Sequence, residues 1–257
     1  MQKRKEKSPK ISIITPSYNQ AKYIEQTIRS VVEQDYSNIE YLIMDGGSTD
    51  GSVEIIKKYA KKYPNIIKWQ SKKDGGQVKA LNEGLKKVSG DIVAYINSDD
   101  YYLPGAFKKV ESRLQKGDWL VGDCIVSDSD LAWTFWIKLL WPIDRHKSFL
   151  RIFNTINQPS VFLTKELIDK VGYFDNDFNY AFDYDYWLRC LSISLPTRLM
   201  ETLSVFRIHS DSKGNTNFEN QFNEDLLVIK KNTKEKLIIA LHQFLDKIVI
   251  VLYRFLK

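Results

Sequence analysis

Cysteine and long apolar runs are scarce in this 257-residue chain. The two cysteines, Cys124 and Cys190, lack the spacing of a metal site and are too few for a disulfide framework, which predicts reduced, buried thiols. No run of 18 uninterrupted apolar residues occurs, so no segment is predicted to span a bilayer. The basic leader, residues 1–9, continues into a short strand-like run rather than the apolar core of a signal peptide. Together these absences predict a cytoplasmic protein.

The charge of the chain is moderately basic. Lysine and arginine number 38 against 32 acidic residues, which gives a formal net charge of +6. This excess favours phosphate-bearing ligands or an anionic membrane surface, although helix lysines are most often a solvated face. The basic residues show no aromatic interleaving or known module, so no nucleic-acid partner is expected. The length fits one large α/β domain, or one domain with an appendage.

Short apolar runs alternate with helical patterns through the first hundred residues. The apolar runs are residues 11–14, 41–44, 66–69 and 92–96. Between them, apolar residues recur at helical spacing, as in Ile24, Ile28 and Val31. This alternation predicts an α/β, Rossmann-like domain with a mostly parallel central sheet and right-handed crossovers.

Acidic residues follow three of these predicted strands. Asp45, Asp74 and the pair Asp99–Asp100 each come just after an apolar run, so parallel strands would gather them at one edge of the sheet. Two adjacent carboxylates beside a buried strand are costly unless a cation or hydrogen bonds compensate. Mg²⁺ and Mn²⁺ prefer such oxygen ligands. The simpler alternative is that each acid forms a turn or a helix cap, but their recurrence at equivalent places favours a shared site.

The second half of the chain is less regular and contains an aromatic stretch. Its apolar side chains fall on one face of a predicted helix: Trp133, Trp136, Ile137, Leu140 and Trp141. Such a face either packs on the sheet or forms an acceptor-side or membrane-contacting surface.

A second helical pattern places Asp183 at the amino end of a helix. Tyr184, Trp187 and Leu188 lie on one face of that helix. Asp183 is then either a helix cap, stabilised by the helix dipole, or a general base beside an acceptor hydroxyl. His209 ends a late strand, where a single histidine is more often structural than a ligand. These residues complete a domain predicted to span residues 10–215.

Residues 216–257 form a predicted C-terminal helical extension. Apolar and charged residues from Leu226 onward repeat as in one or two amphipathic helices. These helices either pack on the domain or lie in a bilayer interface with lysine and arginine reaching the headgroups.

Six motifs occur along the chain in a particular order and spacing: ISIITPSYNQ (11–20), IMDGGSTDGS (43–52), DGGQVKALNEGL (74–85), INSDDYYLPGA (96–106), QPSVFLTKELIDKVGYFD (158–175) and DYDYWLR (183–189). Together they resemble the motifs of family 2 glycosyltransferases with the A-type nucleotide-sugar-binding fold (GT-A). The resemblance covers residues 10–212.

The resemblance implies a nucleotide-sugar site. Thr15, Pro16, Tyr18 and Asp45 would hold the nucleotide base, and Asp74 would lie beside the base or the ribose. A second group of residues would contact the ribose, the diphosphate and the metal.

In that second group, the resemblance makes Asp99 and Asp100 ligands of Mn²⁺ or Mg²⁺, with Asp99 also contacting ribose and diphosphate. Asp183 corresponds to the catalytic base of the family. His209 falls in a segment where some members place a residue near the diphosphate or metal, which is a weaker correspondence.

The sequence departs from the family pattern at three positions. Asn97 stands where the metal motif often has an aspartate, and can hydrogen-bond a ribose without adding charge. Phe182 replaces a common glutamate before Asp183, and Lys79 replaces a common aspartate.

The function implied is inverting transfer of a sugar, with a UDP-sugar favoured, to a hydroxyl of a saccharide or lipid-linked acceptor in surface polysaccharide synthesis. The protein would work in the cytoplasm or peripherally on the inner face of the cell membrane, and a homo-oligomer is compatible with the sequence. A non-catalytic nucleotide-sugar-binding or scaffold subunit is the alternative, which Asn97 and Phe182 would support. A nucleotidyltransferase would need a glycine-rich basic loop after the first strand, which residues 15–20 lack.

Overall fold

Four parallel strands and three helices form the first half of the protein. The computed structural model describes residues 8–114, 117–128, 134–137, 147–152, 154–210, 212 and 218–256. The first elements are β1 (Ile11–Ser17), α1 (Ile24–Val32), β2 (Ile39–Asp45), α2 (Ser52–Lys62), β3 (Ile67–Ser71), α3 (Gln77–Leu85) and β4 (Ile92–Tyr95). The strands pair in the order β3-β2-β1-β4, all parallel, which confirms the α/β alternation read from the sequence.

The second half extends this sheet with strands of both directions. Its elements are β5 (Tyr101–Tyr102), α4 (Ala106–Arg113), β6 (Trp119–Asp128), β7 (Thr134–Ile137), α5 (Lys147–Ile152), the 3₁₀ turn η1 (Gln158–Ser160), β8 (Val161–Thr164), α6 (Lys165–Val171), α7 (Phe182–Ile193), β9 (Thr197–Ile208), α9 (Phe218–Asn232) and α10 (Lys236–Leu256). Strand β8 runs antiparallel to β4 and β6, whereas β6 and β9 are parallel. The α/β class is confirmed, with a central sheet that is parallel in its first half and mixed overall.

The aromatic stretch around Trp136 contains a strand, so the helix predicted there is wrong for its described part. Trp136 and Ile137 belong to β7, which pairs antiparallel with β6 through Ile125 and Cys124. Residues 134–137, Thr-Phe-Trp-Ile, are β-branched or aromatic, and such side chains favour a pleated strand once a neighbouring strand supplies hydrogen bonds. The other predicted members of that face, Trp133, Leu140 and Trp141, lie outside the described residues.

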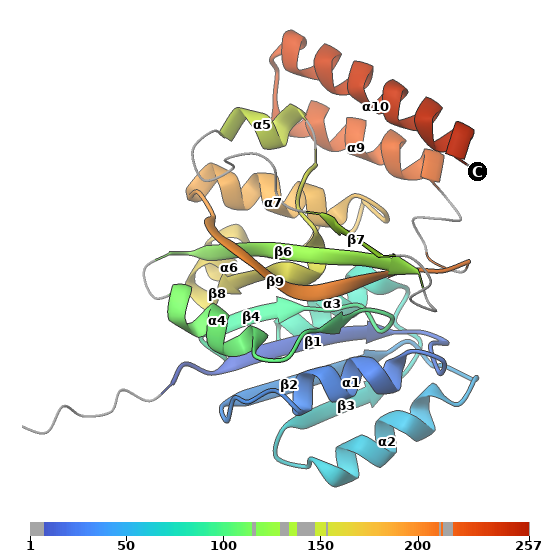
Figure 1. The fold of residues 1–257 in the computed structure, drawn as a ribbon, viewed down its shortest axis with the longest axis vertical. Helices are drawn as coiled ribbons and strands as arrows, with labels where there is room; N and C mark the ends of the chain where they lie inside the picture. The colour runs from blue at the N-terminus through green and yellow to red at the C-terminus, as the bar shows by residue number, and fades with distance from the viewer. Residues whose placement is uncertain are drawn as a thin grey trace, which may run out of the picture.

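The sheet is buried on both faces, and each face has its own apolar core. Helices α1, α2 and α4 cover one face, while α3, α6 and α7 cover the other (Figure 1). Ile13 and Ile14 of β1 point into opposite cores, which explains why the strand is a continuous apolar run. Helix α3 approaches β1 closely at Gly84, where a β-carbon would lie 2.7 Å from Ile14 Cγ2.

Two C-terminal helices form an outer layer over α7. Helix α9 packs on α7, and α10 packs on α9 and α5 (Figure 1). Among the described residues, no helix has both the length and the apolar character needed to cross a bilayer. Cys124 and Cys190 are buried free thiols, as predicted.

Candidate functional site

The loop after β2 is organised around the carboxylate of Asp45. Its Oδ2 accepts hydrogen bonds from the backbone N–H of Gly47 (3.0 Å) and Ser48 (2.9 Å) and from Ser71 Oγ (2.6 Å). Its Oδ1 accepts from Ser48 Oγ at 2.5 Å. The side chain is buried, so its direct effect in this structure is to fix the backbone of the loop at the end of the strand.

Asp74 and Tyr18 come together over the same loop. A β-carbon on Gly46 would lie 3.3 Å from Asp74 Oδ2 and 3.4 Å from Tyr18 Cδ2, so both side chains border this glycine. Asp74 is half-buried and caps the N–H of Gly76 at 2.8 Å, whereas Tyr18 is 63% exposed. An exposed ring beside a carboxylate provides a stacking surface and a hydrogen-bond acceptor for a planar base.

Thr15 and Pro16 lie beneath this surface rather than on it. Thr15 is fully buried, and its Oγ1 accepts a hydrogen bond from the hydroxyl of Tyr41 at 3.0 Å. Pro16 is also buried. Of the predicted base-binding segment, Tyr18 is therefore the residue whose side chain is presented to a ligand.

Asn97 connects the Asp74 loop to the acidic pair. Its Oδ1 accepts from Gln77 Nε2 at 2.8 Å, and Gln77 begins α3 directly after the Asp74 loop. Its Nδ2 lies 3.3 Å from Asp100 Oδ2 and 3.4 Å from Gln158 Oε1. Gln158 in turn donates to the carbonyl of Tyr95 at 2.7 Å. The side-chain amide of Asn97 thus links three segments through hydrogen bonds: the start of α3, the acidic pair and the turn η1.

Asp99 and Asp100 turn in different directions at the end of β4. The Oδ2 of Asp99 lies 3.0 Å from Nε2 of His209, so the structure brings together two residues that are 110 positions apart in the chain. The Asp99 side chain is 19% exposed, whereas Asp100 is fully buried. Asp100 Oδ1 accepts from the backbone N–H of Arg207 at 2.8 Å.

The ionised form of Asp100 is disfavoured by its burial and by the neighbouring charge of Asp99, even with Arg207 beside it. Burial raises the pKa of Asp100 well above its usual range, and the charge of Asp99 raises it further. A divalent ion would favour the ionised form of both carboxylates, so the donor set fits Mg²⁺ or Mn²⁺. Within the described ranges no group of three or more His, Cys, Asp or Glu side chains is assembled as a complete metal site. This is compatible with an ion that shares its coordination with substrate phosphates.

Arg207 is a site residue that the sequence analysis missed. Its Nη1 donates to the carbonyl of Asp99 and its Nη2 to Gln26 Oε1, both at 2.6 Å. The guanidinium also lies over the rings of Tyr23 (4.9 Å) and Tyr101 (5.1 Å). The available signal in the sequence was an arginine inside the strand-like run Leu203–Ile208, since a cation in a buried strand is normally paired. The structure shows that Arg207 is buried.

Asp183 sits at the amino end of α7, where the sequence placed it. It is half-buried, and its Oδ1 accepts from the backbone N–H of Tyr184 at 2.7 Å. Burial raises the pKa of Tyr95, and the charges of Asp183 and then Asp100 raise it further. The ring of Phe182, the residue before Asp183, packs 6.3 Å from the ring of Tyr95, the last residue of β4, so the start of α7 lies against the strand that leads to the acidic pair.

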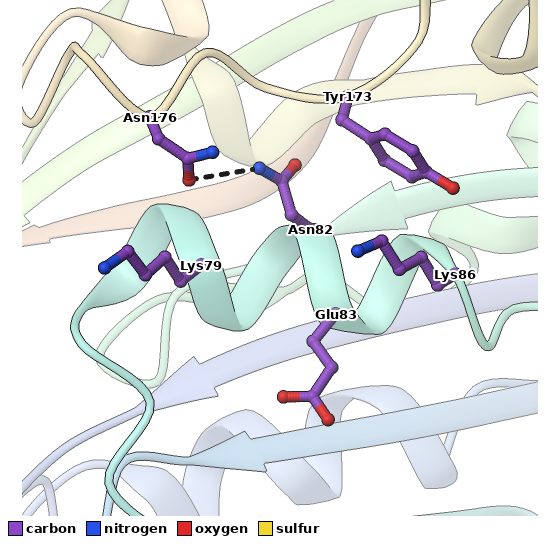
Figure 2. Close-up of a pocket in the computed structure, with 6 residues that line it drawn as sticks. All are labelled: Lys79, Asn82, Glu83, Lys86, Tyr173 and Asn176. Atoms are coloured by element: carbon purple, nitrogen blue, oxygen red, sulfur yellow. Dashed lines mark hydrogen bonds between the residues drawn. The ribbon is translucent and has the colours of Figure 1, made fainter.

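A separate cavity of about 560 Å³ runs along α3. It is lined by Lys79, Asn82, Glu83, Lys86, Tyr173 and Asn176. Figure 2 shows the side chain of Asn82 pointing to Asn176, with Glu83 on the other side of the helix. Asn82 also bonds the backbone of Phe174 with both ends of its amide, which fixes the segment between α6 and α7. None of the predicted site residues lines this cavity.

The fold and the site together define the class of protein. Two solved structures share the fold. One is TarS from S. aureus in complex with UDP-GlcNAc, with a TM-score of 0.69, 19% identity, and coverage of 87% of this chain and 66% of that one. The other is the mannosyltransferase PcManGT from Pyrobaculum calidifontis in complex with GDP-Man and Mn²⁺, with a TM-score of 0.66, 19% identity, and coverage of 93% and 70%. The protein has a GT-A glycosyltransferase fold.

Sequence comparison identifies the family. The family model "Glycosyl transferase family 2" matches residues 12–166. An uncharacterized glycosyltransferase of Rickettsia prowazekii is 31% identical over 255 residues, which cover 93% of this chain and 78% of that protein. One from Mycobacterium tuberculosis is 29% identical over 208 residues, which cover 77% and 75%. The chain belongs to glycosyltransferase family 2, as its motifs indicated.

Proposed function

We propose that this protein is an inverting, metal-dependent glycosyltransferase that uses a nucleotide sugar, with a UDP-sugar favoured, and a hydroxyl acceptor on a saccharide or lipid-linked saccharide. The observation that supports this proposal is a set of hydrogen bonds around the end of β4: Asn97 bonds Gln77, which follows the Asp74 loop, and Asp100, while Asp99 bonds His209. Phe182, the residue before Asp183, packs on Tyr95 at the end of the same strand. The fold neighbours that bind UDP-GlcNAc and GDP-Man support a nucleotide-sugar donor.

In this proposal, Asp99 and Asp100 hold Mn²⁺ or Mg²⁺, with His209 beside them. When bound, the ion neutralises the charge that develops on the leaving diphosphate. Arg207 holds the pair in place, because its guanidinium donates to the carbonyl of Asp99 and its backbone N–H donates to the carboxylate of Asp100. Tyr18 and Asp74 would contact the base, on a loop that Asp45 keeps rigid.

Asp183 acts as general base in the proposed reaction. It takes the proton of the acceptor hydroxyl as that oxygen forms a bond to the anomeric carbon. The bond between the anomeric carbon and the diphosphate oxygen breaks on the opposite face, and a nucleoside diphosphate leaves. A single displacement inverts the anomeric centre and needs no covalent enzyme intermediate.

Donor binding is tested by thermal unfolding with a panel of nucleotides and nucleotide sugars. A UDP-sugar with Mn²⁺ at 100 times its Kd should stabilise the protein by about 2.7 kcal/mol. For a chain of this size, that corresponds to a rise in Tm of roughly 5–10 °C. Release of nucleotide on addition of acceptor would then separate an enzyme from a binding subunit, which releases none. Stabilisation by no nucleotide sugar would contradict the proposal.

We further propose that α10 contacts the surface of an anionic membrane. Its outward apolar side chains recur every three or four residues and are 40–81% exposed: Leu237, Leu241, Phe244, Ile248 and Val251. Lys236 and Lys247 are exposed on the same helix, and its described acid, Asp246, is buried. Apolar insertion flanked by cations suits a headgroup interface, where lipid-linked acceptors would be presented.

Vesicle binding tests this surface. The protein should sediment with phosphatidylglycerol vesicles more than with phosphatidylcholine vesicles. The double variant Leu241→Glu/Phe244→Glu should lower the partition coefficient at least ~10-fold, because each substitution removes an apolar side chain from the membrane interface and adds a negative charge that the anionic lipids repel. Met200→Glu, which alters a 76% exposed residue of β9, is the matched control and should bind as wild type. If the α10 variant sediments with vesicles as the wild type does, membrane contact is contradicted. It is also contradicted if the variant instead dissociates a homo-oligomer, because the surface is then an interface between copies of the protein.

A further inference from the structure

A glutamate of the C-terminal extension holds the segment that leads to Asp183. Oε2 of Glu224, on α9, accepts hydrogen bonds from three consecutive backbone N–H groups: Asn179 (2.8 Å), Tyr180 (2.6 Å) and Ala181 (3.0 Å). Ala181 is the residue before α7, and Asp183 follows two positions later. One carboxylate therefore fixes three successive peptide units directly ahead of the proposed base.

Helix α7 lacks a cap of its own, which explains why a distant carboxylate takes this position. The residue at its N-cap is alanine, which has no side chain that can accept a hydrogen bond. The amino end of a helix carries positive partial charge, which favours a carboxylate nearby. A carboxylate that accepts from three N–H groups makes charge-assisted hydrogen bonds, which are stronger than neutral ones.

Helix α9 is itself fixed to α7 about two turns after Glu224. Nζ of Lys231 donates to Asp185 Oδ1 at 2.9 Å and to Asp175 Oδ2 at 2.6 Å. Asn232 Nδ2 also donates to Asp185 Oδ1, at 3.2 Å. Because α9 is anchored to α7 at its carboxyl end, Glu224 in the middle of α9 is a fixed point against which the segment before α7 is placed.

The acidic residues of α9 around Glu224 interact electrostatically with the proposed base. Burial raises the pKa of Asp225, the neighbour of Glu224, well above its usual range. The charges of Asp183, Asp246 and Glu224 raise it further. The amino end of α7 and the acidic residues of α9 thus share one electrostatic environment.

We infer that Glu224 is a positioning residue for transfer, which sets the place of Asp183 relative to the acceptor hydroxyl; this inference rests on the proposed role of Asp183 as base. A base must lie within hydrogen-bond reach of the proton it removes, and a displacement of 1 Å can lower a rate about 100-fold. The C-terminal extension then contributes to transfer through Glu224, by positioning the proposed base.

Steady-state kinetics of Glu224→Ala and Glu224→Gln test this role. Glu224→Ala should lower kcat about 10- to 100-fold, because the three N–H groups lose their acceptor and the segment moves. The donor KM and the donor-induced rise in Tm should stay within twofold, since the donor residues lie on other elements. Glu224→Gln keeps a side-chain oxygen acceptor and should recover most of kcat. The control Glu235→Ala, which removes an exposed carboxylate paired with Arg151 at 3.8 Å, should match wild type.

A double variant separates positioning from general loosening of the fold. In an Asp183→Asn background, Glu224→Ala should lower the residual rate no further, because residues that act through one group are not additive. The inference would be overturned if Glu224→Ala lowered the residual rate of Asp183→Asn as much as it lowers the wild-type rate. It would also be overturned if Glu224→Ala alone lost donor affinity in parallel with kcat, or left kcat unchanged. If the single variant Asp183→Asn retains turnover, the proposed base is wrong. That measurement does not involve Glu224, so failure of the proposed base can be distinguished from failure of the positioning role.

Discussion

The Asp183→Asn variant should bind the donor as the wild type does and lose at least ~10³-fold in transfer rate. An amide of the same shape keeps the acceptor for the N–H of Tyr184 (2.7 Å in the wild type), so α7 should fold normally. It cannot accept a proton from the acceptor hydroxyl, and general base catalysis contributes roughly 10²–10⁴-fold. The measurement is nucleotide release at saturating donor and acceptor, with donor binding followed by thermal unfolding.

Asp177→Asn is the matched control for that experiment. Asp177 is an exposed carboxylate six positions before Asp183, in the same segment ahead of α7. Its removal should leave the transfer rate within about twofold of wild type, as expected for an exposed site outside the proposed machinery. If Asp183→Asn turned over as fast as Asp177→Asn, Asp183 would be only a residue of the helix start, which is the alternative that the sequence left open.

The second large effect is expected at the acidic pair. Asp100→Asn should abolish the stabilisation of the protein by Mn²⁺ and lower the transfer rate at least ~10²-fold, because one of the two proposed carboxylate ligands is lost. Without metal, the free energy of unfolding should remain within about 1 kcal/mol of wild type or rise, since a buried ionisable group has been replaced by a neutral one. Thermal unfolding with and without Mn²⁺ measures both effects.

The direction of the pKa shift fixes the pH dependence of the metal-free wild type. The pKa of Asp100 is raised on folding, so the folded state binds a proton more tightly than the unfolded state. The stability from this group is fully present below the unfolded pKa and is lost as pH rises through the folded pKa. Asp100→Asn should remove that part of the pH dependence. Activity that persists in EDTA, or Mn²⁺ stabilisation that survives Asp100→Asn, would exclude this metal site.

Local sequence determined the framework that places the site. Runs such as Ile11–Ile14 are buried on both faces and can therefore be recognised as strands without knowledge of their neighbours. Since parallel strands end at a common edge, the sequence also predicted that Asp74 and Asp99 would lie along that edge. The helix that begins near Asp183 followed from its apolar spacing.

The functions of individual side chains within that edge depended on partners far along the chain. Asp45 was predicted to hold the base, and the structure adds that its carboxylate accepts hydrogen bonds from its own loop and from Ser71. Arg207 had no recognisable motif, because its contacts with the Asp99–Asp100 segment join residues more than 100 positions apart. Trp136 followed a helical spacing but lies in a strand, because β6 supplied the hydrogen bonds.

By itself, the sequence determined the order of strands and helices through β4, the family, and the edge at which acidic side chains were expected to collect, because these depend on local periodicity and motif spacing. Only the tertiary structure decided that Asp99 meets His209, that Asp100 is buried against Arg207, and that Glu224 holds the segment before Asp183. The physical reason is that these hydrogen bonds join residues 43 or more positions apart. No local pattern encodes from which N–H group a distant carboxylate will accept a hydrogen bond.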